Sequence, residues 1–152
     1  MSLRTDRPGG TVDAEIQYMR TRVLIIDDNA DQRTSLRLCL QMHGYVVEEA
    51  ANGRLGLELQ RRRPCDVVVT DLFMPEQDGI ETISELRLEY PSVPIIAVSG
   101  VASRTGADFL RVAEALGANR TFRKPYAIEE LIDAIRGFTE ARPSGGGAPA
   151  GR

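Results

Sequence analysis

Short apolar runs alternate five times with segments of helical periodicity along the middle of this chain. The runs predict strands at residues 22–26, 45–50, 66–70, 94–98 and 120–123. The periodic segments predict helices at residues 29–43, 53–63, 78–90, 106–116 and 127–138. Strands that are apolar throughout need cover on both faces, and strands that alternate with helices favour parallel pairing. The pattern therefore predicts an α/β fold: a doubly wound, five-stranded parallel sheet with helices on both faces.

Polar residues and glycines mark the ends of the predicted helices. Asn29 is placed to cap the first helix, with Gln32 three residues later in the capping-box position. Asp78 and Glu81 form the same pattern at the start of the third helix. Gly117 follows the fourth helix, where a glycine commonly ends one. These signals support helices between the strands rather than long loops.

Composition bounds the domain organisation. With 152 residues, 42% of them hydrophobic, the chain can bury the core of one domain. We expect that domain at residues 21–140, with a mostly flexible extension at 1–20 and a disordered tail at 141–152. A net charge of -3 argues against a general nucleic-acid or membrane surface. The basic run at residues 61–63 is typical of a solvated helix end.

Cysteine usage and the missing targeting signals suggest a cytoplasmic protein. No apolar stretch of the sequence approaches the roughly 18 residues that span a bilayer, and the N-terminus lacks a signal-peptide core. Cys39 and Cys65 lie within apolar helix and strand patterns, so we expect buried thiols in a reducing compartment. His43, the sole histidine, is predicted in the last helical turn before Gly44.

Chemically capable residues follow four of the five predicted strands. In a doubly wound sheet the ligand site lies at the carboxyl ends of the strands. Those positions hold the following residues in chain order: Asp27 and Asp28 after the first strand, Asp71 after the third, Ser99 after the fourth and Lys124 after the fifth. The second strand ends in Glu48, Glu49 and Ala50 and has no such group, as expected for an edge strand. Each residue alone has an ordinary explanation in turns and helix starts, but together they predict one site.

The charges of this predicted site point to a metal ion and an anion. Three neighbouring carboxylates repel one another unless a cation lies among them. Oxygen ligands without imidazole or thiolate suit Mg²⁺, which keeps open positions for water and phosphate oxygens. Lys124 is the only lysine among 19 basic residues, and its compact ammonium can meet a phosphoryl oxygen in a tight pocket. One carboxylate could then act as nucleophile and form an acyl phosphate.

The set of motifs resembles the receiver domains of two-component response regulators, of which chemotaxis regulators are examples. The likeness covers about residues 23–138. It is carried, in the order and spacing of the family, by the following segments: Asp27-Asp28, residues 71–79 with the sequence DLFMPEQDG, Ser99-Gly100 and Lys124-Pro125. The resemblance implies the flavodoxin-like strand order 2-1-3-4-5. It also implies a cis peptide bond between Lys124 and Pro125.

By the same resemblance Asp71 is the phosphoacceptor, Ser99 the switch hydroxyl and Lys124 the cation that pairs with the phosphoryl group. Asp28 and Asp71 would bind Mg²⁺ with the backbone carbonyl of Phe73, and Asp27 would help through a water molecule. The implied partners are a sensor histidine kinase or histidine phosphotransfer protein and a downstream effector or fused output domain, with homodimer formation on phosphorylation. The implied reactions are self-phosphorylation and autodephosphorylation only, without any other enzymatic activity.

The sequence departs from the family pattern beside the predicted lysine. The usual switch aromatic falls on Thr121, and an aromatic follows one position later as Phe122. Adjacent strand residues point to opposite faces, so Phe122 cannot replace the aromatic. We therefore expect the output face to respond through Thr121 or to respond weakly. Phe73 and Val101, which would line the approach of water, are apolar, so the acyl phosphate is expected to be relatively long-lived.

Three other functions are open to a chain with this pattern of strands and acidic residues. A phosphatase of the haloacid-dehalogenase type needs a second acid two residues after the nucleophile, and that position holds Phe73. A flavin or nucleotide binder needs a phosphate loop after the first strand, where Asp27 and Asp28 would repel a phosphate. A pseudo-receiver that binds partners without phosphorylation is the main alternative. The sequence leaves open whether the receiver stands alone or was cut from a longer protein.

Overall fold

The computed structural model describes residues 20–74, 79–100 and 104–140, with the backbone alone for 104–108. Its strands are β1 (Arg22–Ile26), β2 (Val46–Ala50), β3 (Val67–Asp71), β4 (Ile95–Ser99) and β5 (Arg120–Arg123). They form one five-stranded parallel sheet in the order β2-β1-β3-β4-β5, with β2 and β5 at the edges. The predicted sheet and its strand order are confirmed.

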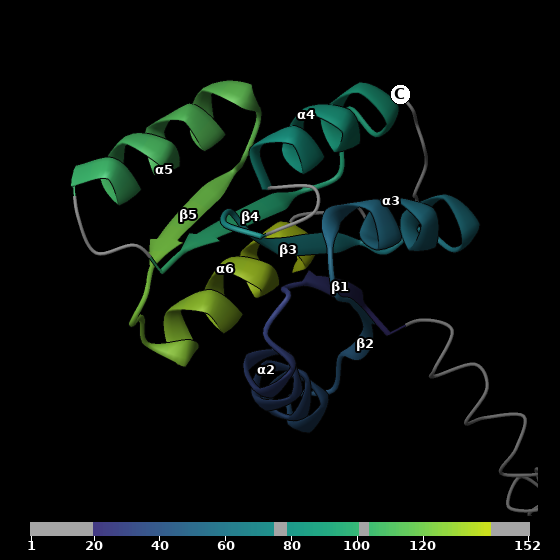
Figure 1. Ribbon diagram of the computed structural model, residues 1–152. Coiled ribbons are helices and arrows are strands. Elements are labelled where there is room, and N and C mark those ends of the chain that lie inside the picture. Colours follow the sequence, from purple (N-terminus) through teal and green to yellow (C-terminus); the bar gives the residue numbers. More distant parts are fainter. Residues whose placement is uncertain (1–19, 75–78, 101–103, 141–152) are drawn as a thin grey trace, which may run out of the picture.

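Helices cover both faces of the sheet, as predicted. They are α2 (Ala30–Met42), α3 (Gly53–Arg62), α4 (Gly79–Glu89), α5 (Arg104–Leu116) and α6 (Ile128–Glu140). Figure 1 shows α2 and α6 on one side of the sheet and α3, α4 and α5 on the other. Among the described residues, no helix has the length and apolar character that crossing a membrane requires.

Two apolar cores lie on the two faces because successive strand residues point in opposite directions. Leu24, Ile26 and Val68 pack toward α3, α4 and α5, where Ile83 and Leu86 of α4 are fully buried. On the other face the core joins α2 and α6 to the remaining strand residues, and its members are Val23, Ile25, Leu40, Val67, Val69, Ile96, Val98, Phe122, Leu131, Ile132, Ala134 and Ile135. The double burial explains the continuous apolar runs at residues 23–26 of β1, 67–69 of β3 and 95–98 of β4.

Several element ends differ from the predicted ones by one or two residues. Asp71 and Ser99 still pair in the sheet as the last residues of β3 and β4, although both were predicted to follow their strands. Helix α5 begins at Arg104 rather than at Gly106. The first amide groups of a helix bind capping groups outside the helix, and these are not part of the apolar pattern. The pattern therefore locates a helix start only to within one or two residues. The sheet edge on which the site was predicted is unaffected.

Some predictions fall outside the described residues. These are the flexible extension and tail, the cap at Asp78, and the position of Val101. Among the described helix ends, Asn29 caps α2 as predicted, because its side chain accepts a hydrogen bond from the Gln32 amide. His43 and Gly44 end that helix as predicted, and Gly44 has a φ of 94°.

Two local predictions were wrong, and a third was confirmed with an added contact. Gln32 does not complete a capping box, because Asp27 Oδ1 already accepts the hydrogen bond of the Asn29 amide at 2.9 Å. Cys39 is only partly buried because it lines a groove beside α2, whereas Cys65 is buried as predicted. The basic run at residues 61–63 is exposed at the end of α3, as predicted, and Arg61 also binds both carboxylate oxygens of Glu89 on α4, at 2.9 and 2.7 Å.

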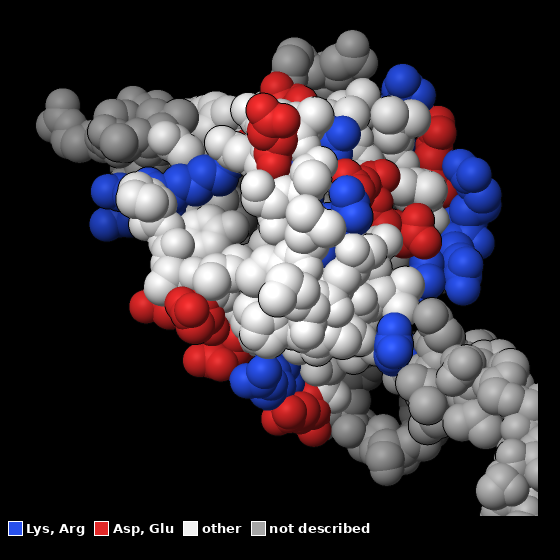
Figure 2. Space-filling view, turned by 90° about the horizontal axis from the view of Figure 1, so that it is seen from below, with Lys and Arg blue, Asp and Glu red and all other residues white. Residues whose placement is uncertain are grey.

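The outer surface of α2 differs from the charged rim around it. Figure 2, which views the molecule from below, shows a broad area of uncharged residues with acidic and basic groups mainly around it. Two apolar side chains of α2 are exposed, Leu38 at 50% and Met42 at 85%. The apolar stripe of α2 is therefore wider than the part that the core uses.

Candidate functional site

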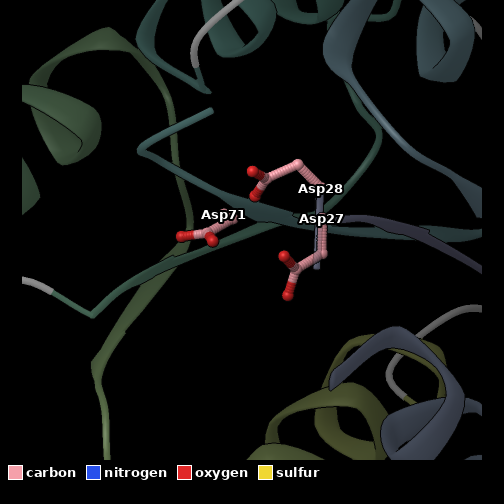
Figure 3. A group of neighbouring side chains, drawn as sticks. All are labelled: Asp27, Asp28 and Asp71. Carbon is pink, nitrogen blue, oxygen red and sulfur yellow. The ribbon is translucent and has the colours of Figure 1, made fainter. Parts of the chain in front are cut away.

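Three aspartates meet at the carboxyl edge of the sheet. Asp27 and Asp28 follow β1, and Asp71 ends β3, the neighbouring strand. Figure 3 shows the two consecutive aspartates projecting to opposite sides of β1, with Asp71 beside them. A carboxylate oxygen from each of the three lies within 4.8 Å of the others. The sheet thus brings together the acidic residues that were predicted to share a site.

This set of donors fits a hard divalent cation. All the side-chain donors are carboxylate oxygens, and Mg²⁺ prefers oxygen ligands over nitrogen or sulfur. Asp27 is nearly buried at 8% exposure, while Asp28 is exposed to solvent. A cation held between them would offset the mutual repulsion of the three carboxylates and still keep positions open toward the solvent side.

Asp71 is the most perturbed acid of the site. Burial raises its pKa to about 6, and the nearby Asp27 adds to the rise. Lys124 and the backbone amides of Leu72 and Phe73 act in the opposite direction, and the Leu72 amide donates to Asp71 Oδ1 at 2.9 Å. The carboxylate therefore lies in a poorly hydrated place, where a nearby cation would favour its charged form.

Gly79, the first residue of α4, packs directly on the backbone of Asp71 and Leu72. A Cβ atom at this position would collide with the Asp71 carbonyl oxygen and the Leu72 Cα atom. The Gly79 amide also donates to the Leu72 carbonyl at 3.0 Å. Only glycine permits so close an approach, so Gly79 lets α4 begin directly beside the main chain of Asp71.

Lys124 reaches the site from the end of β5. Its Nζ atom is 3.6 Å from Asp71 Oδ2 and 3.8 Å from Asp27 Oδ2. The backbone amide of Lys124 donates to the Ser99 carbonyl at 2.9 Å, which ties the end of β5 to β4. The peptide bond between Lys124 and Pro125 is cis, as the family resemblance implied. The predicted convergence of this lysine with the aspartates is confirmed.

Ser99 and Phe73 lie at the same edge of the sheet. Ser99 is fully buried as the last residue of β4, one position beyond Val98, the partner of Asp71 in the sheet. Phe73 follows Asp71 by two residues, and its ring packs edge to face against Phe109 of α5 at a centroid distance of 4.9 Å. Their assigned roles as switch hydroxyl and carbonyl ligand remain predictions.

Thr121 and Phe122 lie on opposite faces of β5, as the sequence predicted. The Thr121 hydroxyl donates to Glu114 Oε2 of α5 at 3.1 Å. Phe122 instead joins the buried core shared by α2 and α6, and its ring centroid is 5.5 Å from that of Tyr126. The aromatic side chain is therefore directed away from the α5 face, and a hydroxyl takes its place there.

Three neighbours of the site were not predicted as such. Gln32 accepts a hydrogen bond from Lys124 Nζ at 2.6 Å, across 92 positions of sequence. Arg33 donates to the Asp27 carbonyl at 2.7 Å and thereby holds the end of β1. Burial raises the pKa of Tyr126 to about 12, with Asp27 and Asp71 adding to the rise. The only sequence signals were a cap pattern for Gln32 and proximity to Lys124 for Tyr126.

A groove of about 610 Å³ opens beside the aspartates. It runs between the first turns of α2 and the segment that leads from β5 into α6. Its lining residues are Asp27, Asp31, Gln32, Ser35, Leu36, Cys39, Lys124, Pro125, Tyr126 and Ile128. Because Asp27 and Lys124 belong both to the groove and to the acidic site, the site can be reached from this side.

Comparisons with known proteins agree on one family. The family model of the response regulator receiver domain matches residues 23–136. The response regulator MprA of Mycolicibacterium vanbaalenii is 37% identical over 122 residues, which cover 78% of this chain and 50% of that protein. The chain therefore spans about half the length of such curated relatives. The sporulation initiation phosphotransferase F of Bacillus subtilis is 28% identical over 120 residues, 79% of this chain and 94% of that protein.

Solved structures show the same likeness. The chemotaxis protein CheY4 of Vibrio cholerae superposes with a TM-score of 0.71 at 29% identity, over 78% of this chain and 98% of that one. A response regulator receiver domain protein from Clostridium thermocellum gives a TM-score of 0.74 at 26% identity, over 80% and 95% of the two chains. The family match, the relatives and the fold lead to one conclusion: this chain belongs to the receiver domains of two-component response regulators.

Proposed function

We propose that this receiver is a phosphoacceptor switch in which Asp71 takes up a phosphoryl group. The observation that carries the proposal is the arrangement of Asp71 beside two further aspartates and 3.6 Å from the only lysine of the chain. Few other functions need a partly buried carboxylate between an acidic pair suited to a metal ion and an ammonium group. A receiver that binds partners without phosphorylation would have no need for this set of charges.

In the proposed reaction an oxygen of the Asp71 carboxylate attacks the phosphorus atom of the donor. The bond between phosphorus and the donor's leaving group breaks, and its electron pair departs with the leaving group, which is then protonated. Lys124 donates to one phosphoryl oxygen and the Ser99 hydroxyl to another, and the residues that would hold Mg²⁺ are Asp28, Asp71, Phe73 through its carbonyl, and Asp27 through water. When bound, Mg²⁺ offsets the negative charge that builds up on the phosphoryl oxygens.

The proposed partners follow from this chemistry. The donor is a phosphohistidine of a sensor histidine kinase or a histidine phosphotransfer protein in the cytoplasm. The added phosphoryl group carries about -1.5 to -2 charges and three acceptor oxygens, and these bias the contacts at the edge of the sheet. The output is a downstream effector or a fused domain, and phosphorylation also promotes homodimer formation. The chain carries out only its own phosphorylation and dephosphorylation, and the apolar Phe73 side chain makes the phosphorylated form long-lived.

Intact mass spectrometry after incubation with phosphoramidate and Mg²⁺ tests the proposal. We expect one phosphoryl addition to the full chain, none in Asp71→Asn, and none when the metal is removed with a chelator. Asp133→Asn is the matched control because Asp133 is an exposed aspartate of α6. A phosphoryl group that also adds to Asp71→Asn, or no addition to the unaltered chain, would contradict the proposal. A half-life of seconds for the phosphorylated form would contradict its predicted long lifetime.

A further inference from the structure

The hydrogen bond that Lys124 makes is not to a carboxylate. Its Nζ atom lies 2.6 Å from the side-chain oxygen of Gln32, and 3.6 and 3.8 Å from the nearest oxygens of Asp71 and Asp27. The first distance is a short hydrogen bond, and the other two are ion-pair distances. In this state the ammonium is therefore held by a neutral amide on α2, at the rim of the acidic site.

A closed set of contacts places the backbone of Gln32 between the acidic site and the lysine. Asp27 Oδ1 accepts a hydrogen bond from the Asn29 amide at 2.9 Å. The Asn29 side chain accepts one from the Gln32 amide at 2.9 Å, and the Gln32 side chain then binds Lys124. Lys124 Nζ in turn lies 3.8 Å from Asp27 Oδ2. The first turn of α2 is thus built between the acidic site and the lysine, and it places the Gln32 backbone where the exposed Gln32 side chain reaches Lys124.

We propose that Gln32 is a positioning residue that holds the ammonium of Lys124 in the unphosphorylated protein and gives it up when Asp71 is phosphorylated. This inference rests on the proposed function, because it needs a phosphoryl group on Asp71. A lysine binds a charged phosphoryl oxygen more strongly than a neutral amide oxygen, so the exchange is favourable. The bond to Gln32 stabilises only the unphosphorylated state, and its loss should therefore shift the balance toward the phosphorylated state.

Nuclear magnetic resonance can follow this exchange at a single site because Lys124 is the only lysine. The full chain labelled with ¹³C at the lysine ε carbon gives one lysine side-chain signal. Gln32→Met removes the acceptor but keeps a long, helix-favouring side chain. Gln41→Met makes the same change farther along α2, where Gln41 contacts Arg37. In Mg²⁺ buffer we expect Gln32→Met, and not Gln41→Met, to shift the lysine signal.

Beryllofluoride, a mimic of the phosphoryl group, then tests whether Lys124 leaves Gln32 when the site is filled or keeps the contact. With the mimic bound, the lysine signals of the unaltered chain and of Gln32→Met should coincide, because the ammonium has left Gln32 in both. The affinity for beryllofluoride should be about threefold to tenfold higher in Gln32→Met, as expected for one lost hydrogen bond to a charged group that is partly exposed. Gln41→Met should bind the mimic as the unaltered chain does.

The inference is overturned if the lysine signal does not respond to Gln32→Met in the resting state. It is also overturned if the two signals still differ with beryllofluoride bound, or if Gln32→Met binds the mimic no better than the unaltered chain. These failures differ from a failure of the proposed function, in which the unaltered chain would neither bind beryllofluoride nor gain a phosphoryl group on Asp71. In that case the exchange is overturned as well.

Discussion

Two basic side chains hold opposite ends of the sheet in different ways. Arg87 of α4 lies at the amino ends of β4 and β5, where its two terminal nitrogens donate to five oxygen atoms. Four of these are backbone carbonyls and the fifth is the Asn119 side chain, at distances from 2.7 to 3.1 Å. Lys124, at the carboxyl ends, has one amide oxygen at 2.6 Å and two carboxylates beyond 3.5 Å.

The comparison shows that the partners of a cation, more than its charge, separate a structural role from a functional one. Arg87 binds neutral acceptors that cannot leave, and Asn119 in turn accepts a hydrogen bond from the Ile95 amide at 2.8 Å. Lys124 has hydrogen-bonding capacity left for an incoming anion, because an ammonium group carries three donors. The arginine end of the sheet should therefore determine stability and the lysine end should determine phosphorylation.

Replacing Arg87 should give the largest loss of stability. Arg87→Met leaves several backbone carbonyls without their donor, and we expect the free energy of unfolding to fall by about 3 kcal/mol. Phosphoryl addition to the folded fraction should persist. Urea denaturation and intact mass measure the two effects. Arg136→Met is the control, since Arg136 is a half-exposed residue of α6 and should cost less than about 0.5 kcal/mol. Equal losses of stability in Arg87→Met and Arg136→Met would show that Arg87 has no special structural role.

Replacing Lys124 should weaken binding of the phosphoryl mimic and hardly change stability. Lys124→Met removes a charged donor to the phosphoryl group, and we expect the affinity for beryllofluoride to fall by about tenfold to a hundredfold. Stability in Mg²⁺ should change by less than about 1 kcal/mol, because the lysine side chain is partly exposed and its ion pairs are long. Titration with the mimic and urea denaturation test this. A large loss of stability with unchanged affinity would assign Lys124 to structure.

The stability of the metal-free protein should depend on pH through Asp71, the carboxylate beside Lys124. The pKa of Asp71 is raised from 3.8 to about 6 in the folded state, so ionising it costs stability. The cost is absent below about pH 4, develops as the pH rises to about 6, and is complete at pH 7. With a chelator present, Asp71→Asn should therefore be more stable than the unaltered chain by about 2 kcal/mol at pH 7, a value reduced for partial solvent exposure.

Urea denaturation of both proteins at about pH 4 and pH 7 checks this sign, with Asp133→Asn as the control. The difference should vanish at the lower pH and shrink when Mg²⁺ is added, because the cation stabilises the charged carboxylate. A difference that stays constant with pH would show that titration of Asp71 does not cause it.

The smallest expected effect concerns Thr121, on the side of β5 that faces α5. Thr121→Val keeps the shape of the side chain but removes the hydrogen bond to Glu114, at a cost of about 0.5 to 1 kcal/mol. If Thr121 carries the response to α5, beryllofluoride should shift the backbone amide signals of β5 and α5 in the unaltered chain, and less in this variant. Thr139→Val on α6 is the control, because its hydroxyl bonds only within its own helix. Unshifted signals in the unaltered chain would exclude this route.

The fold and the site were predictable because they follow from local rules. Continuous apolar runs indicate strands buried on both faces, and parallel strands bring their carboxyl ends to one edge. That reasoning alone places Asp27, Asp71 and Lys124 together. The errors in the element bounds were small shifts, and Asp71 and Ser99 still belong to their strands. Such ends depend on individual hydrogen bonds that a binary pattern does not contain.

The polar contacts that support the site were not predictable in the same way. Gln32 and Lys124 are 92 positions apart, and Arg87 and Gly117 are 30 apart. Each of these polar residues has an ordinary local interpretation, such as a cap or a charged helix face. The direction of a long polar side chain is decided by the packing of distant elements. A single sequence therefore shows which chemical groups reach the edge of the sheet, but not which of their bonds hold them in place.

Gly79 has a mechanical consequence for the receiver. Helix α4 begins in direct contact with the main chain that carries the phosphoacceptor, and the two are joined by the hydrogen bond from Gly79 to Leu72. The contacts between Gly79 and the main chain of Asp71 and Leu72 are made by backbone atoms. A shift of the Asp71 backbone should therefore move the first turn of α4 directly, because the two backbones are in contact.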